Sequence, residues 1–266
     1  MINIKTPEEI KIMARGGGIL AETLSEVLKN IKPGVSELEL DGLAERLIRE
    51  KGGEPGFKRV PGYKHTICVS TNDVVVHGIP TAYRFKEGDV AGIDCGVFYK
   101  GFHTDAAQTV RVQELKFPPS PRLRRAGKTQ NSDEVDRFLT AGKKALDEAI
   151  KKASLGNRVG DISKTIQDIV EGEGYSVVRS LVGHGVGREL HEEPEVPGYL
   201  NRNIKNTPLL KENMVIAVEV IYNMGESDVS YDNSDGWTIS TKDKSLSGLF
   251  ERTVAVSKNG PRVLTN

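Results

Sequence analysis

Two amphipathic helices are predicted at the start of the chain, each introduced by a capping signal. Thr6-Pro7-Glu8-Glu9 offers an N-cap hydroxyl, a proline at the first helical position and the acid of a capping box. Ser36-Glu37-Leu38-Glu39 is a second capping box. Apolar residues then recur every three or four positions, and the helices are predicted to end near Gly34 and at Gly52-Gly53. The recurring apolar residues are Leu20, Leu24, Val27 and Leu28, and then Leu40, Leu43, Ala44, Leu47 and Ile48.

The rest of the chain mixes predicted strands with two further helices. After a loop rich in glycine and proline at 54–65, the runs 66–70 and 74–76 predict short strands, and 89–112 predicts two strands joined by a tight turn. The later helices carry apolar stripes at Phe138, Leu139, Ala145, Leu146, Ala149 and Ile150, and at Ile162, Ile166, Ile169 and Val170. Further strands are predicted at 176–182, 213–222, 236–241 and 249–256.

Two aspartates, Asp94 and Asp105, lie on the predicted hairpin. If Tyr99 and Lys100 form the turn, the two carboxylates lie directly opposite each other. Their repulsion then favours a divalent cation between them. If Lys100 and Gly101 form the turn, the register shifts by two residues and both carboxylates face solvent. The hairpin alone leaves both alternatives open.

The segment 114–131 has no apolar period and combines prolines with basic residues, so it predicts an exposed connection. The basic residues are Arg122, Arg124, Arg125 and Lys128. A solvated loop is the favoured interpretation. The alternative is a contact with ribosomal RNA, since basic side chains of this kind bind phosphates.

Composition excludes several classes of protein. Lysine plus arginine and aspartate plus glutamate both number 37, so no global charge draws the chain to nucleic acid or to an anionic membrane. Two cysteines, Cys68 and Cys95, give no disulfide framework and suit a reducing cytoplasm. No early apolar run resembles a signal peptide, and none is long enough to cross a bilayer. We therefore expect a soluble, cytoplasmic protein and a monomer.

The second half of the sequence resembles the first, which indicates an internal duplication. Corresponding positions are Gly34 and Gly156 before a helix, Gly52 and Gly174 after it, and His77-Gly-Ile-Pro80 and His191-Glu-Glu-Pro194 beyond it. Paired acidic residues on strands follow in each half. We expect a single domain spanning 1–266, with halves of about 1–113 and 132–266 that face each other across a shared cleft.

Four carboxylates and one imidazole are candidate metal ligands. Glu219 lies inside an apolar run, and a buried carboxylate needs a partner because burying it unpaired is very costly. Glu251 sits similarly, although Arg252 or solvent could satisfy it. Together with the two aspartates and one histidine, these acids suit two divalent ions that share bridging carboxylates.

The histidines divide into three groups. His184 lies between glycines in Gly183–Gly187, where small residues let the backbone approach another group closely. His65 and His103 are interpreted as ordinary surface or sheet residues. His77 and His191 each stand three residues before a proline, which suits turn capping, but their duplicated placement favours a catalytic role.

These motifs make the chain similar to the type I methionine aminopeptidases of the pita-bread fold along nearly its whole length. The motifs that carry the resemblance are Val76–Pro80, Asp94 in GIDCG, Asp105 in HTDAA, Gly183–Pro194, Glu219, Trp237–Asp243 and Phe250–Val254. The resemblance implies an α+β pita-bread fold, with duplicated halves of helices and antiparallel strands around a central metal cleft. It also implies removal of the initiator methionine from nascent polypeptides, preferentially when the second residue is small.

The resemblance assigns roles to individual residues. It implies two divalent ions (Co, Mn, Fe or Zn), with Asp105 and Glu251 bridging and a hydroxide between the metals as the nucleophile. Glu219 moves the proton to the leaving amine, His191 donates to the oxyanion, and His77 holds the substrate amide. The implied ligands are Asp94, Asp105, His184, Glu219 and Glu251. The implied methionine pocket consists of Tyr63, Cys68, Leu190 and Trp237.

Three features depart from the family pattern, and two alternative functions stay open. Val220 replaces a usual proline, Arg252 replaces a usual histidine, and 114–131 is long for type I. One alternative is an Xaa-Pro aminopeptidase or dipeptidase of the same fold, which usually carries a large N-terminal domain. The other is a non-catalytic ribosome-associated protein on this fold. Decayed ligand residues would favour that second alternative, whereas all five are present.

Overall fold

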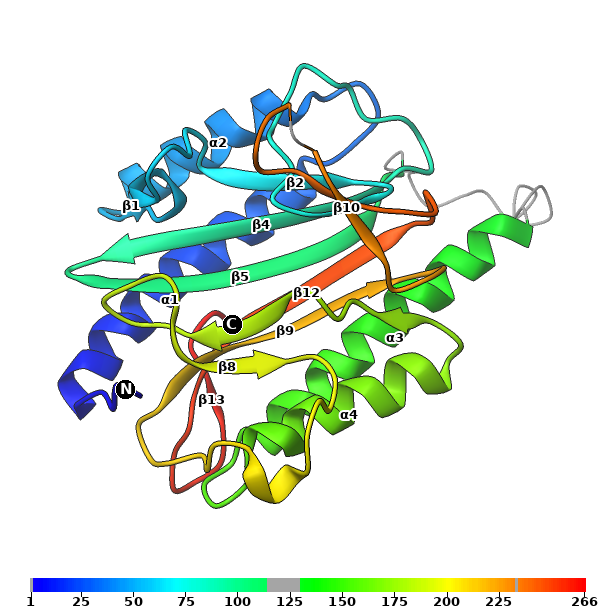
Figure 1. The fold of residues 1–266 in the computed structure, drawn as a ribbon. Coiled ribbons are helices and arrows are strands. Elements are labelled where there is room, and N and C mark those ends of the chain that lie inside the picture. The colour runs from blue at the N-terminus through cyan, green and yellow to red at the C-terminus, as the bar shows by residue number, and fades with distance from the viewer. Residues whose placement is uncertain (1, 114–129, 233) are drawn as a thin grey trace, which may run out of the picture.

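A curved antiparallel sheet forms the centre of the computed structural model, which describes residues 2–113, 130–232 and 234–266 (Figure 1). Along its main path the strands follow the order β1-β4-β5-β12-β9-β7-β8. These strands are β1 (Glu54–Pro55), β4 (Val90–Tyr99), β5 (Phe102–Arg111), β7 (Val182–Gly185), β8 (Glu192–Pro197), β9 (Val215–Asn223) and β12 (Ser247–Ala255). Three short strands pair with members of this path: β2 (Ile67–Thr71) with β4, β6 (Ser176–Val177) with β9, and β13 (Arg262–Val263) with β12. Because β5 and β12 are neighbours, the sheet joins both halves of the sequence.

A smaller sheet of three strands lies in the order β10-β11-β3. Its strands are β3 (Val74–Val76), β10 (Val229–Tyr231) and β11 (Ile239–Thr241). Because β3 ends directly before His77 and β11 begins just after Trp237, this sheet brings one segment from each half of the chain together.

The helices repeat as two pairs of equal lengths. The first pair is α1 (Pro7–Lys29) and α2 (Glu37–Glu50), of 23 and 14 residues, and the second is α3 (Gln130–Lys152) and α4 (Val159–Gly172), of 23 and 14 residues. The predicted capping boxes at Thr6 and Ser36 are both present. The four duplicated glycines all adopt positive φ, from 79° to 89°, which glycine tolerates without steric cost.

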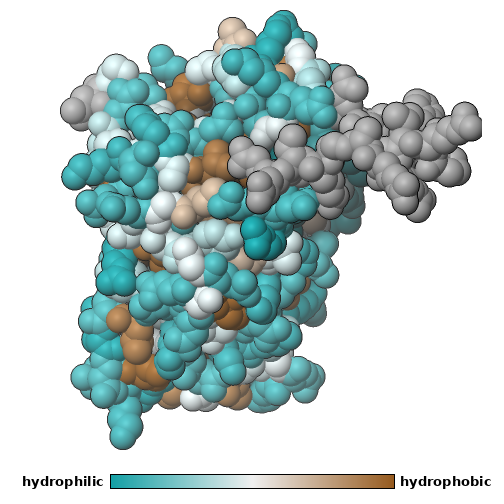
Figure 2. All heavy atoms as spheres, turned by 90° about the vertical axis from the view of Figure 1, so that its right-hand side faces the viewer, coloured by the Kyte–Doolittle hydropathy of each residue, from teal (hydrophilic) through white to brown (hydrophobic). Residues whose placement is uncertain are grey.

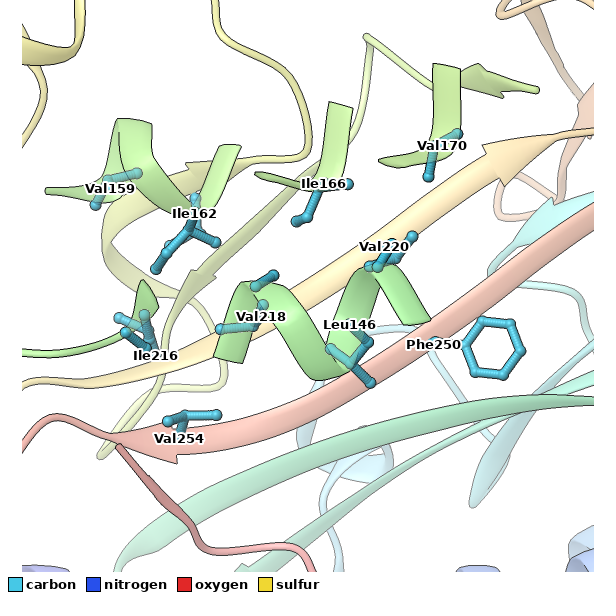
Figure 3. Close-up of a cluster of buried hydrophobic side chains, with 14 of the residues drawn as sticks. Leu146, Val159, Ile162, Ile166, Val170, Ile216, Val218, Val220, Phe250 and Val254 are labelled. Carbon is cyan, nitrogen blue, oxygen red and sulfur yellow. The ribbon is translucent and has the colours of Figure 1, made fainter. Parts of the chain in front are cut away.

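Alternation along the long strands directs one face of the sheet towards the helices. In β4, Ile93 and Val97 pack in a cluster with residues of α1 and α2. In β9, Val218 and Val220 lie against α3 and α4, as Figure 3 shows for the second half. Because side chains alternate along a strand, Asp94 and Glu219 then face the opposite side. The helix face forms the two largest hydrophobic clusters, and the other face carries these acidic residues beside a smaller apolar cluster.

The turn of the central hairpin decides between the two predicted registers. Tyr99 pairs with Phe102, so Lys100 and Gly101 form the turn, and both adopt positive φ, as a tight hairpin turn requires. The Tyr99-Lys100 register, which places the aspartates directly opposite each other, is therefore wrong. Asp94 pairs with Ala107 and Asp105 pairs with Gly96, so the two aspartates are diagonal neighbours on the same face, two pairs apart. The expectation that this register leaves both carboxylates in solvent is also wrong, as described below.

Several element boundaries differ from the predictions. The predicted strand 176–182 is divided into β6 and β7, and the predicted loop 54–65 contains β1 and a short 3₁₀ turn at Phe57–Arg59. Helix α3 begins at Gln130, inside the predicted connection 114–131. The rest of that connection, 114–129, lies outside the described residues, as do its four basic side chains. β8, β10 and β13 have short or weakly alternating sequences and were not predicted.

The outer surface is largely hydrophilic on the face seen in Figure 2, with separate apolar patches. None of the helices within the described residues combines the length and apolar character needed to cross a membrane.

We predict that Ile166→Ala lowers the free energy of unfolding by about 2–5 kcal/mol, because Ile166 is fully buried between α4 and the sheet and its truncation leaves a cavity. Ile169 on the same helix is only partly buried, so Ile169→Ala is the matched control and costs less. Chemical denaturation measures both variants. Equal losses would contradict the packing described for α4.

Candidate metal centre

Five neighbouring strands each contribute one candidate ligand to the open face of the sheet. In the order β4-β5-β12-β9-β7, these residues are Asp94, Asp105, Glu251, Glu219 and His184. All five line one pocket. The first two come from the N-terminal half of the chain and the other three from the C-terminal half, so the sheet brings together residues that are far apart in sequence.

The like-charge pair that the sequence suggested for the first hairpin occurs in the second half instead. Glu219 and Glu251 are direct partners across β9 and β12. The Arg252 guanidinium donates to the carbonyl oxygens of Ala107 and Glu251 and to Gln108 Oε1, and its charge only partly offsets the burial and neighbouring acids that raise the pKa of Glu251. Two carboxylates directly opposite each other destabilise a sheet unless a cation or protons compensate the charge.

Three carboxylate oxygens at the centre are buried without a hydrogen-bond partner. They are Asp94 Oδ1, Asp105 Oδ1 and Glu251 Oε1. Ligand atoms of Asp105, His184 and Glu251 all lie within 4.8 Å of one another. Buried acceptors without donors are costly, and a divalent cation would satisfy them. The residues therefore fit a metal site.

His184 presents one ring nitrogen to the cluster. Its Nδ1 lies 2.8 Å from the carbonyl oxygen of Gly185, which can only accept a hydrogen bond, so Nδ1 carries a proton. Its Nε2 lies 3.3 Å from Glu219 Oε1. A backbone carbonyl that fixes the tautomer in this way is typical of metal-binding histidines.

The pKa values follow from burial of like charges. Burial, followed by the charge of Glu219, raises the pKa of Asp94 to about 7. Burial and the charge of Asp94 raise the pKa of Asp105, and burial and the charge of Asp105 raise that of Glu251. Burial lowers the pKa of His184, but the hydrogen bond and charge of Glu219 outweigh it, so the net shift is upward. In the absence of a cation the cluster therefore holds extra protons at neutral pH.

His77 and His191 line the same pocket as the five candidate ligands. The ring of His191 lies edge-on to that of His184, with 4.4 Å between centroids. Burial, together with the charge of His184, lowers the pKa of His191 to about 4, and burial lowers the pKa of His77. Both imidazoles are therefore neutral at pH 7 and can each donate one N–H.

The backbone at His77 has a left-handed conformation, with φ 57°. This conformation is uncommon for a residue other than glycine and often marks a functional site. The next residue, Gly78, packs so closely on β2 that an added Cβ would lie 2.0 Å from the carbonyl oxygen of Val69. The first His-x-x-Pro motif is thereby fixed against the sheet.

An apolar recess adjoins the carboxylates. Cys68 on β2 is the direct cross-strand partner of Asp94, and the Tyr63 hydroxyl lies 3.1 Å from the Cys68 sulfur. The rings of Tyr63 and Trp237 pack edge to face with centroids 5.1 Å apart. Leu190 belongs to the same buried cluster. All four residues that the sequence resemblance assigned to a methionine pocket thus line one cavity.

The sequence interpretation missed part of the lining. Phe57 and Val60, from the loop 54–65, also line the pocket. Phe57 packs so tightly on β4 that a Cβ at Gly96 would lie 2.7 Å from its ring. The sequence signals for this contact are Gly56-Phe57 in the loop and Gly96 on the strand. Because the loop has no apolar periodicity, the sequence does not show which strand residue Phe57 contacts.

Comparison with known proteins identifies the family. A model of metallopeptidase family M24 matches residues 11–258. The chain belongs to metallopeptidase family M24. Methionine aminopeptidase from Clostridium perfringens is 40% identical over 265 residues, covering 100% of this chain and 99% of that protein. Methionine aminopeptidase 1 from Bacillus subtilis is also 40% identical over 265 residues, with the same coverage.

Solved structures agree with this family assignment. The crystal structure of methionine aminopeptidase from Thermotoga maritima superposes with a TM-score of 0.90 at 37% identity, and each chain covers 100% of the other. The prolidase from Pyrococcus furiosus shares the fold, with a TM-score of 0.73 at 23% identity, and this chain covers 65% of it. The predicted α+β pita-bread fold and the similarity to methionine aminopeptidases are confirmed, and the protein is an M24 metallopeptidase.

The two residues that depart from the expected methionine aminopeptidase pattern, Val220 and Arg252, face away from the candidate ligands. Val220 is fully buried on the helix side of β9, where Figure 3 shows it near α3. Arg252 on β12 also alternates away from Glu251 and lines a groove between α1 and the sheet. Neither side chain lines the pocket of the five candidate ligands.

The two remaining histidines, His65 and His103, do not line the pocket of the five candidate ligands. His65 Nδ1 lies 3.2 Å from an Asp41 carboxylate oxygen. His103 is buried on β5 and packs against Phe98, with 4.8 Å between ring centroids. The prediction that these are ordinary sheet or surface histidines agrees with their positions.

We predict that bound metal stabilises this M24 protein. A metal that binds only the folded state raises the free energy of unfolding by about 2.7 kcal/mol when its free concentration is about a hundredfold above Kd. The physical reason is that the clustered carboxylates gain a counter-charge. Chelator should therefore lower the Tm, and Mn²⁺ or Co²⁺ should restore it. Chelator pre-loaded with metal is the control. An unchanged Tm in a sample verified as metal-free would contradict the site.

The stabilisation by metal should grow as the pH rises. Without metal, Asp94 keeps its proton up to about pH 7, whereas the unfolded chain releases it near pH 4, so the metal-free protein loses stability between these values. Metal must displace this proton, so the increase in Tm on adding Mn²⁺ should be larger at about pH 8 than at about pH 5. Equal increases at both pH values would contradict proton displacement.

Proposed function

We propose that the protein removes the initiator methionine from nascent polypeptides, preferentially when the second residue is small. The observation that carries the proposal is the apolar recess directly beside the buried carboxylates. The names of the full-length relatives support it as well. Nascent chains are cytoplasmic, and the two buried, unpaired cysteines suit that reducing compartment.

The recess has the chemistry that a methionine side chain requires. Tyr63 and Trp237 offer aromatic rings and Leu190 an aliphatic wall, and a thioether packs favourably against aromatic edges. Burial and the charge of Asp94 raise the pKa of the Cys68 thiol, so it stays neutral and adds no charge to the recess. Because Cys68 pairs with Asp94, the recess opens where the first peptide bond would meet the carboxylates.

Five residues would hold two divalent ions. They are Asp94, Asp105, His184, Glu219 and Glu251. Hard carboxylate oxygens with one imidazole suit Co, Mn, Fe or Zn. Bound ions would polarise the carbonyl and acidify the attacking water.

Three side chains would carry the remaining chemistry. Glu219 is half of the paired glutamates and contacts His184, so its carboxylate can accept a proton from the nucleophile and pass it to the leaving amine. The neutral His191 ring can donate an N–H to the developing oxyanion. His77, held rigidly by the docking of Gly78, can hold the substrate amide.

A ribosome contact through 114–131 stays a prediction from the sequence alone. Arg122, Arg124, Arg125 and Lys128 carry that prediction.

We predict that Met-Ala-Ser is hydrolysed in the presence of Mn²⁺ or Co²⁺ and that an Xaa-Pro substrate is not, because the recess fits methionine. Steady-state assays with both peptides, with and without metal, test this. Faster turnover of the Xaa-Pro substrate would instead support a proline-specific peptidase. No turnover of either peptide by metal-loaded protein would support a non-catalytic role.

We predict that the three pocket histidines respond differently to alanine substitution. His184→Ala should lose both metal and rate, since its Nε2 faces the cluster. His191→Ala should keep the metals and KM but lose about 10²–10³ in kcat, as removal of one oxyanion donor does. His77→Ala should resemble His191→Ala with more of the loss in KM. Elemental analysis beside kinetics distinguishes them, and metal loss in His191→Ala would contradict the assignment.

A further inference from the structure

A buried ion pair joins the N-terminal segment to the turn that carries His191. Lys5 Nζ lies 2.6 Å from Glu192 Oε2, and each side chain is only 4% exposed. Glu192 follows His191 directly in the sequence. In every other Lys or Arg ion pair within the described residues, at least one side chain is 20% exposed or more, so Lys5–Glu192 is much more buried than these pairs.

The second oxygen of the same carboxylate closes the turn. Glu192 Oε1 accepts the backbone N–H groups of Arg188 at 2.7 Å and Glu189 at 3.3 Å. One carboxylate therefore connects both ends of the turn 188–192 and ties it to Lys5. Leu190 and His191 lie inside this turn, and both line the pocket.

Lys5 is itself fixed at both ends. Its backbone N–H donates to the carbonyl oxygen of Asn213, and its ammonium also donates to the carbonyl oxygen of Asn3. The pair lies directly on Gly187, where an added Cβ would stand 2.5 Å from Lys5 Cε and 2.6 Å from Glu192 Oε1. Glycine at this position therefore leaves room for the pair.

The side chain of His191 lacks an anchor of its own. Within the described residues, its ring packs edge-on against His184 and makes no side-chain hydrogen bond. The position of the ring thus depends on the backbone of the turn. A displacement of about 1 Å in a catalytic group can lower the rate about 10²-fold.

We propose that Lys5 and Glu192 are positioning residues for His191, and that their buried ion pair sets the rate of peptide hydrolysis through the turn 188–192. The inference rests on the proposed role of His191 at the oxyanion. Lys5 does not line the pocket that contains the five candidate ligands. Its effect on the reaction passes through the placement of one imidazole.

The test is a double-mutant cycle on metal-loaded enzyme with a Met-Ala-Ser substrate. Lys5→Met should lower kcat at least tenfold with KM changed less than twofold and metal content unchanged. In a His191→Ala background the same Lys5→Met substitution should cost less than twofold, because the group that it positions is gone. A structural role alone would give the same loss in both backgrounds.

Three further variants keep the test decisive if Lys5→Met folds poorly. Lys5→Arg preserves the charge and should retain most of kcat. Gly187→Ala keeps both charges but displaces the pair, so it should lower kcat as Lys5→Met does. The matched control is Arg188→Met, which removes the exposed bridge from the same turn to Glu9 and should leave kcat within twofold.

The outcomes separate the two proposals. If His191→Ala alone leaves kcat unchanged, the proposed role of His191 fails. If His191→Ala lowers kcat but Lys5→Met costs as much in that background as in the wild type, the positioning inference is overturned and the proposed function is not affected. A fall in kcat for Arg188→Met equal to that for Lys5→Met would also overturn it.

Discussion

Burial of four carboxylates at one point of the sheet is the constraint on which the rest of this structure depends. Glu219 faces Glu251 across β9 and β12, and both are close to the two aspartates. In a metal-free protein this arrangement persists only if protons neutralise part of the charge. The surrounding strands must therefore be held together by other interactions, chiefly the two helix-covered clusters of apolar residues on the opposite face.

The alternation of side chains separates stability from chemistry. Each long strand carries its ligand on one face and its core residues on the other, so Glu219 and Val220 are neighbours in sequence with different roles. This explains why a valine at position 220 is compatible with the candidate ligand set. Val220 fills a fully buried position among α3, α4 and the sheet, so the size and shape of its side chain determine how well it packs. The side chain points away from the candidate ligands because it alternates with Glu219 along the strand.

Much of the fold and the candidate site could be predicted from the sequence, because the signals were local. Capping boxes and apolar periods located the four helices, and Glu219 inside an apolar run indicated a buried acid. The hairpin register could not be predicted, because Tyr99-Lys100 and Lys100-Gly101 are both acceptable turns locally. The partnership of Lys5 with Glu192 was equally hidden, since 187 residues separate them and nothing near either one indicates the other.

The two halves of the chain meet in the sheet where β5 lies beside β12, and candidate ligands lie on both sides of this junction. The junction therefore resembles a subunit interface, although one chain forms both sides. The N-terminal half contributes Asp94 and Asp105, and the C-terminal half contributes His184, Glu219 and Glu251. Neither half holds all five candidate ligands, so affinity for a cation would be a property of their association. Thr253 lies on β12, and its hydroxyl accepts the backbone N–H of Asp105 on β5 and donates to the carbonyl oxygen of the same residue, so it connects the two strands at this junction. Substitutions at Thr253 should therefore alter metal retention.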